Sequence, residues 1–202
     1  MTARMAGVAG VALLSVGCAT TSFVSTWKAP DAQPFQPSGA KVVALVMNSN
    51  EAARRAAETA LAGELTKLGA VGVAMHTLTP QATPGSEAQV RAIVEKEGAT
   101  GVVVLRPTGT RQEISSTSTM YAGPSYGPFW GGYYGYGWGA PYGGTEIRTD
   151  TIVSIETLVY SLRQNKLVWA GQSKTTNPTN IESFVREIAT AAIRELRKEG
   201  LL

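Results

Sequence analysis

The chain has 202 residues, of which 44% are hydrophobic and 16% charged, and its formal net charge is +3 at pH 7. This length is enough to bury the core of one domain. The basic residues are scattered along the chain, whereas a nucleic-acid-binding surface needs a basic stripe. The composition therefore argues against a nucleic-acid partner, and a small positive charge is typical of a solvated surface.

The amino-terminal segment has the three parts of an export signal. Arg4 gives a short positive start, residues 6–16 are uncharged, and small residues precede Cys18, the only cysteine. The uncharged run is too short to span a bilayer, which takes roughly 20 apolar residues. This pattern predicts a lipoprotein signal, in which residues 1–17 are removed and the Cys18 thiol carries a lipid. The alternative is an ordinary cleaved signal that leaves Cys18 as an unpaired thiol.

Lipidation of Cys18, with palmitate among its acyl groups, would anchor the mature chain to a membrane. We expect the outer membrane, with the folded domain on the periplasmic side. Ala19 follows the cysteine, and in enterobacterial lipoproteins an Asp at that position often retains the protein in the inner membrane. The alternative is secretion to the periplasm without an anchor.

Residues 18–40 are rich in Ser, Thr and Pro. Such a stretch buries too little apolar area to offset its ordering entropy, so we predict a lipidated tether. A strand over residues 23–28 is an alternative for part of it. Four apolar residues are candidates for docking back onto the domain: Phe23, Val24, Trp27 and Phe35.

We place a single domain at residues 41–202. Residues 42–47 are a continuous apolar run, which is typical of a strand buried on both faces. Residues 48–50 offer N-cap side chains to a helix whose apolar residues keep helical spacing up to Gly69. Residues 71–78 predict a second strand.

A second helix follows a turn-rich loop. Ser86 and Gln89 form a capping box, and the apolar residues after them keep helical spacing until Gly98. Residues 101–105 are another apolar run, which polar alternation extends to about Ser118. This segment therefore predicts a long third strand.

The carboxy-terminal part of the chain predicts a hairpin and a helix. Residues 147–162 and 167–176 have strand composition, and Asn165 lies in the short turn between them. Thr179 and Glu182 make a capping box before the strongest amphipathic helix in the chain. The order β-α-β-α-β-β-β-α predicts an α+β fold, with a mixed sheet of about five strands and helices packed on it.

Three segments carry a resemblance to known proteins: the Gly-Ala-Thr-Gly-Val-Val-Val run at 98–104, and residues 158–162 and 166–171 of the hairpin. They resemble the superfamily that includes the amino-terminal domain of the TolB propeller protein, the curli-secretion channel lipoprotein and the lipoprotein activator of penicillin-binding proteins. The resemblance covers residues 41–198 and implies a helix-backed sheet and an envelope setting. It assigns no functional residue. Those families often have an acidic residue where Tyr160 or Ser161 stands here.

The sequence offers few residues for catalysis or metal binding. His76, the only histidine, falls in a predicted strand and is expected to be a hydrogen-bonded structural residue. With Cys18 acylated, His and Cys ligands cannot assemble a zinc site. There is no Gly-x-Ser-x-Gly elbow and no phosphate-binding loop. We therefore expect no catalytic residue, metal or cofactor, with a hydrolase or transferase that uses His76 or a strand carboxylate as the alternative. Trp169 is expected in the core.

A long loop, residues 119–146, interrupts the hairpin between the third strand and the next. Residues 121–144 hold nine glycines, nine aromatic residues and no charge. Glycine at this density disfavours regular structure, and Tyr and Trp are typical of binding loops. The candidate contact residues for an envelope protein or glycan are Tyr126, Phe129, Trp130, Tyr133, Tyr134, Tyr136, Trp138 and Tyr142.

Two other interpretations of this loop remain open: a low-complexity insertion without a partner, and a loop that contacts membrane or forms oligomers. The working hypothesis is a lipid-anchored, non-catalytic binding or assembly module of the cell envelope. An oligomeric secretion or channel-associated component is the alternative, and the sequence determines no oligomeric state.

Overall fold

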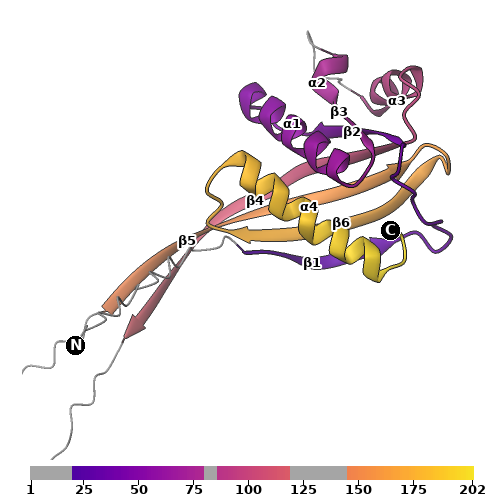
Figure 1. Ribbon diagram of the computed structural model, residues 1–202. Helices are drawn as coiled ribbons and strands as arrows, with labels where there is room; N and C mark the ends of the chain where they lie inside the picture. Colours follow the sequence, from indigo (N-terminus) through magenta and orange to yellow (C-terminus); the bar gives the residue numbers. More distant parts are fainter. Residues whose placement is uncertain (1–19, 80–85, 119–144) are drawn as a thin grey trace, which may run out of the picture.

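The computed structural model describes residues 20–79, 86–118 and 145–202, which form a six-stranded mixed sheet with helices packed on it (Figure 1). The strand order is β1-β6-β5-β4-β2-β3. This confirms the predicted α+β class. The strands are β1 Thr20–Lys28, β2 Lys41–Val46, β3 Val71–Ala74, β4 Gly101–Ser118, β5 Thr145–Ser161 and β6 Lys166–Thr176. The helices are α1 Glu51–Lys67, α2 Met75–Leu78, α3 Glu87–Lys96 and α4 Ile181–Lys198.

Strand β1 corrects the predicted strand number and the predicted tether. It pairs antiparallel with β6 from Thr20 to Lys28, and the Phe23 ring packs edge-on against Trp169 with the ring centroids 5.4 Å apart. The described part of segment 18–40 therefore belongs to the domain. Composition did not show this because β1 is stabilised by a sheet edge formed about 150 residues later in the chain.

The helix ends follow local signals closely. Asn50 caps α1 by accepting a hydrogen bond from the Ala53 amide at 3.0 Å, and Ser86 caps α3 in the predicted position. Gly69 follows α1 in the left-handed region with φ +90°, as a helix C-terminus favours. At α4 the prediction was one residue early, because the Asn180 side chain rather than Thr179 accepts from the first turn.

The segment predicted as one strand over 71–78 is divided in two. β3 ends at Ala74, and α2 turns the chain away from the sheet. The amide of His76 donates to the Glu58 carboxylate at 2.8 Å. A side chain of α1 thus replaces the strand partner that a longer β3 would need, so His76 lies on a short helix and not on a strand.

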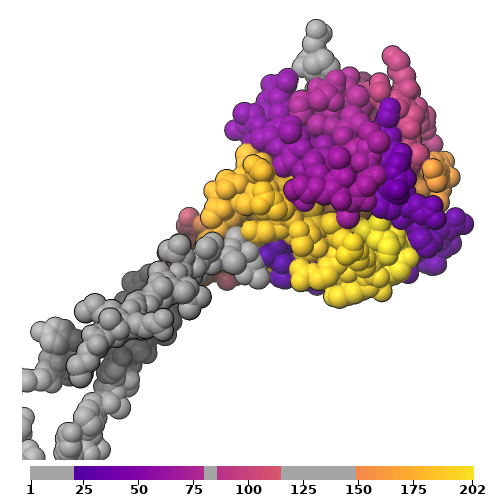
Figure 2. All heavy atoms as spheres, in the orientation of Figure 1, coloured from indigo at the N-terminus to yellow at the C-terminus, as the bar shows by residue number. Residues whose placement is uncertain are grey.

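The two faces of the sheet are covered unequally. Helices α1 and α4 pack over one face, here called the covered face, with Val46, Leu61 and Ile188 in its core. Figure 2 shows the molecule from this side, where atoms of α1 and α4 make up much of the surface. Helix α3 packs on the opposite face, here called the open face, where Val94 meets the β2 and β4 side chains. Leu158 and Tyr160 of β5 pack against the same cluster. The open-face side chains of β6 and β1 belong to none of the core clusters formed by the described residues.

Strands β4 and β5 continue beyond the other strands as a two-stranded ribbon (Figure 1). β2 pairs with β4 only as far as Leu105, and β6 reaches β5 only at Ile152. The β4–β5 pairing runs on to Ser118 and Thr145. The predicted long hairpin is therefore confirmed, and the aromatic segment joins the strands at the end of this ribbon.

Candidate binding groove

The open face is hollowed by a groove of about 660 Å³ between α3, the strands β4 and β5, and the β5–β6 turn. Pockets that hold small molecules measure roughly 300–1,000 Å³. The apolar lining residues are Leu45, Val46, Met47, Val90, Val94, Val102, Val104, Leu158, Tyr160, Leu162 and Leu167.

Strand register builds the floor of the groove. Side chains that face one another across neighbouring strands share a face of the sheet. Tyr160 stands between Val102 of β4 and Leu167 of β6, and Leu158 pairs with Val104. On its other side Leu158 pairs with Ala170, whose partner on β1 is Trp27. Trp27 is 47% exposed, so the apolar floor continues to the sheet edge.

A β-bulge in β6 determines which of its side chains face the groove. Val159 pairs with Trp169 and Tyr160 with Leu167, so Val168 is the extra residue of β6. Val168 and Trp169 consequently both lie in the buried core cluster of the covered face. The bulge thus directs Leu167 to the groove while Trp169 stays in the core, as predicted from sequence.

Charged side chains stand at the two ends of the groove. At one end Arg106 of β4 donates through Nε to Glu156 at 2.7 Å. At the other end Arg91 of α3 donates to the Asn165 side chain in the β5–β6 turn. Lys166 lies beside that turn, with its Nζ 2.6 Å from an Asp31 carboxylate oxygen. The contact between Arg91 and Asn165 joins α3 to the β5–β6 turn at this end of the groove.

Tyr160 places a hydroxyl group in the apolar floor. Burial raises the pKa of the Tyr160 hydroxyl, and the nearby Glu87 carboxylate raises it further, against a smaller opposing effect of Arg106. The hydroxyl is therefore protonated at neutral pH and able to donate a hydrogen bond. Among the described residues it has no hydrogen-bond partner.

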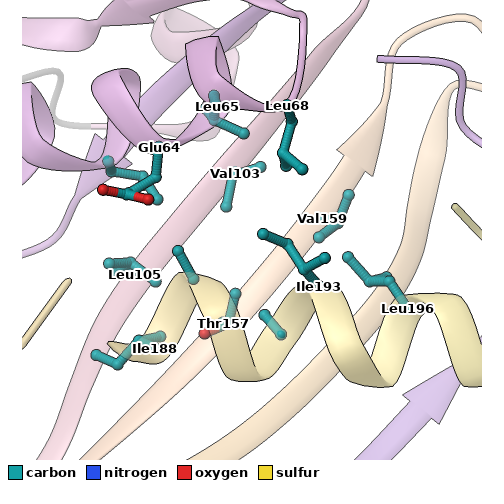
Figure 3. A pocket seen from close by; sticks show the side chains of 13 residues that line it. Glu64, Leu65, Leu68, Val103, Leu105, Thr157, Val159, Ile188, Ile193 and Leu196 are labelled. Carbon is teal, nitrogen blue, oxygen red and sulfur yellow. The ribbon is translucent and has the colours of Figure 1, made fainter. Parts of the chain in front are cut away.

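A second, smaller pocket of about 50 Å³ lies on the covered face between α1 and α4 (Figure 3). Leu65 of α1 and Leu68, the residue after this helix, face Ile193 and Leu196 of α4 across it. The Thr157 hydroxyl lies at its floor and has no hydrogen-bond partner among the described residues. A water molecule takes up roughly 30 Å³ in the liquid, so this pocket is too small for an organic ligand of ordinary size.

Sequence reasoning missed a buried charged cluster beside the end of β2. Glu58 of α1 has a side-chain exposure of 0%, and its carboxylate accepts hydrogen bonds from Arg54 Nη1 at 3.2 Å and from the Val46 amide at 3.3 Å. His76 Nδ1 lies 3.0 Å from the same carboxylate. The tautomer of His76 with the proton on Nδ1 can donate a hydrogen bond to this carboxylate. The spacing of Arg54 and Glu58 was the one available signal, and it does not show burial.

The other sequence-predicted sites fall largely outside the described ranges. Residues 1–17, the lipid attachment residue Cys18 and the eight aromatic contact residues all do. In the described ranges, His, Cys, Asp and Glu form no group of three or more that could hold a metal ion. No helix there is long and apolar enough to cross a membrane.

The fold and groove define the chain as an α+β domain with a mixed sheet and one partly uncovered face. No protein-family model matches it, and no curated protein matches it in sequence. Its fold is similar to that of the PelC dodecamer from Paraburkholderia phytofirmans, with a TM-score of 0.44 and 14% identity over 86% of this chain and 94% of that one.

Two further solved structures share the arrangement weakly. Lipoprotein GNA1162 from Neisseria meningitidis has a TM-score of 0.38 and 14% identity, over 80% of this chain and 99% of that one. A PDZ domain protein from Parabacteroides distasonis has a TM-score of 0.36 and 7% identity, over 91% of this chain and 38% of that one. These similarities concern the fold alone.

Proposed function

We propose that this chain is a lipid-anchored protein of the bacterial cell envelope that acts as a non-catalytic binding module. The export signal before Cys18 supports the envelope setting. The finer proposal is an anchor at the outer membrane, with palmitate among the acyl groups and the domain on the periplasmic side.

The groove of the open face is the observation that carries the binding role. Leu158 packs at the edge of the α3 cluster and stays partly exposed, Leu167 lies beside Tyr160 on the next strand, and Trp27 extends the apolar area to the sheet edge. An apolar area of this kind on an exposed face marks an interaction site. A bound ligand would keep these side chains from water.

The proposal of a non-catalytic role rests on the ion pairs and hydrogen bonds that the polar residues form. Arg91, Arg106 and Lys166 each form an ion pair at the groove. His76 on α2 is held by the Glu58 carboxylate of α1. Catalysis by acid and base needs a titratable side chain placed at a reacting atom. For the alternative of a His-dependent hydrolase or transferase, His76→Ala should abolish activity.

Two measurements test the proposed function. Mass spectrometry of the mature protein should find residue 18 at the amino terminus, carrying a diacylglyceryl group. The neutral hydrophobic dye Nile red should gain fluorescence with the full chain and lose this gain in Leu158→Asp. Ile114→Asp is the matched control, since Ile114 lies on the ribbon and is 72% exposed. Equal fluorescence in both variants would refute binding at the groove.

The β4–β5 ribbon favours the alternative of an oligomeric secretion or channel-associated component. Among the described residues, β4 after Leu105 and β5 before Ile152 pair only with each other. An isolated two-stranded ribbon is marginally stable in water. A neighbouring copy would supply the missing support. This alternative predicts rings in electron microscopy and a multiple of the chain mass in light scattering.

The aromatic segment remains the second proposed contact element, for an envelope protein or glycan. Deletion of residues 121–144 should leave the domain folded, because the core clusters lie in other elements. The same deletion should remove an envelope partner that co-purifies with the intact chain. An unchanged set of partners would refute the contact role.

A further inference from the structure

The two arginines that line the groove are already engaged within the protein. Arg91 of α3 forms an ion pair with Glu95 and also contacts the Asn165 side chain. Arg106 of β4 contacts Glu156 on the neighbouring strand through both Nε and Nη2. A negatively charged ligand would therefore have to displace a partner from either guanidinium.

The other charged residues of the lining do not favour an anion either. Lys166 directly precedes Leu167 on β6, so its side chain leaves the strand on the side opposite to the floor. The Lys166 Nζ lies 2.6 Å from an Asp31 carboxylate oxygen. Glu87 adds a negative charge to the lining, and a cation would meet it together with Arg91, four residues along the same helix. These charges favour a ligand without charge, because a charged group that loses its water needs a free counter-charge.

Tyr160 carries the polar group of the floor that no other residue uses. The remaining hydroxyl and amide side chains of the lining each accept a hydrogen bond within the protein: Asn48, Ser86, Ser161 and Asn165. The Tyr160 hydroxyl makes no hydrogen bond with the described residues. Burial raises the pKa of this hydroxyl, and Glu87 and Arg106 of the lining act on it more weakly, in opposite directions. The hydroxyl is therefore a protonated donor within reach of the groove.

Apolar side chains flank this donor along the floor. Tyr160 stands between Val102 of β4 and Leu167 of β6. Leu158 lies two residues away on the same face of β5, a distance of roughly 7 Å along the strand. An elongated apolar body over Leu158 and Leu167 would thus have one hydrogen-bond donor beside it. An uncharged carbonyl oxygen matches this donor, because it accepts a hydrogen bond and brings no donor that would itself need a partner.

We propose that the groove binds an uncharged, elongated apolar molecule that carries a carbonyl group, such as a ketone or an ester. The Tyr160 hydroxyl donates to the carbonyl oxygen, and the apolar body lies over Leu158 and Leu167. This inference rests on the proposed function of the groove and names the class of its ligand. A hydrocarbon of the same shape would cover the hydroxyl without pairing it, which costs free energy.

The test uses two fluorescent probes and the full chain with Cys18→Ser, so that no acyl chain attached to the protein competes. Prodan is an uncharged naphthalene dye with one ketone, and 2-(dimethylamino)naphthalene is the same dye without the ketone. Tyr160→Phe should weaken prodan binding about fivefold, because one hydrogen bond between neutral groups is lost. The emission of bound prodan should also move to shorter wavelength, as its carbonyl loses the donor. The affinity for the dye without the ketone should stay unchanged, which also shows that the variant is folded.

The matched control is Thr157→Val, which removes a hydroxyl of the same strand from the pocket of the covered face. It should change the binding of neither dye. Equal prodan affinity and emission in the wild-type groove and in Tyr160→Phe would overturn the carbonyl proposal while leaving groove binding intact. Tighter binding of the carboxylate analogue of prodan than of prodan itself would overturn the uncharged class. Absence of binding of both dyes and of Nile red would overturn the proposed function itself.

Discussion

Replacing Glu58 with Gln should destabilise the domain more than any change of an exposed charge. The Glu58 carboxylate is wholly buried and neutralises Arg54, whose own side chain is almost completely buried. Glu58→Gln leaves the Arg54 guanidinium without a counter-charge in the interior. Removing one partner of a buried ion pair costs about 3–5 kcal/mol.

This cost is a large part of the total stability, since the free energy of unfolding of a domain is about 5–15 kcal/mol. Urea unfolding of the full chain, followed by tryptophan fluorescence and far-UV circular dichroism, measures the change in free energy. The slope of the free energy of unfolding against urea concentration should be the same for the wild type and Glu58→Gln if both unfold in the same two-state reaction.

Glu51→Gln is the matched control on the same helix. Glu51 pairs with Arg55 at the same spacing of four residues, with 2.6 Å between Arg55 Nη2 and Glu51 Oε1, but both side chains are exposed. We expect no measurable loss of stability, because exposed pairs are screened by solvent. A loss in Glu58→Gln as small as in Glu51→Gln would refute the burial argument.

Three further predictions concern packing, and urea unfolding measures each. Thr157→Val should raise the free energy of unfolding by about 1 kcal/mol, because it removes a buried hydroxyl that has no partner among the described residues. Thr175→Val should lower it by a similar amount, because that variant loses a 2.7 Å hydrogen bond to Thr21. Equal effects of the two variants would contradict this. Gly72→Ala should be strongly destabilising, since an added Cβ would lie 2.0 Å from a backbone oxygen of α1. Gly63→Ala should stabilise α1 by about 1 kcal/mol, because open space surrounds Gly63; a loss there would refute the packing described.

Local signals predicted most of the secondary structure. The cap residues Asn50 and Ser86 and the stop at Gly69 lie within a few positions of the helix ends that they define. They can therefore be recognised from the sequence alone. The alternation that carried the third predicted strand to Ser118 is equally local. These elements appear in the structure at nearly the predicted limits.

Distant partners explain the errors. β1 is a strand because β6 offers it an edge, and residues 71–78 divide because Glu58 accepts the His76 amide from 18 positions away. The spacing of apolar residues along the chain indicates neither of these distant partners. The candidate groove was missed for the same reason, since Arg91, Tyr160 and Lys166 belong to three separate elements.

The sequence by itself predicted the α+β class and the ends of α1 and α3, because periodicity and capping are properties of neighbouring residues. The export signal before Cys18 is likewise a prediction from local composition. Only the tertiary structure decided which half of the sheet stays uncovered and which charge is buried. Both depend on the positions of α1, α3 and α4 on the sheet. These positions follow from packing between residues far apart in the chain.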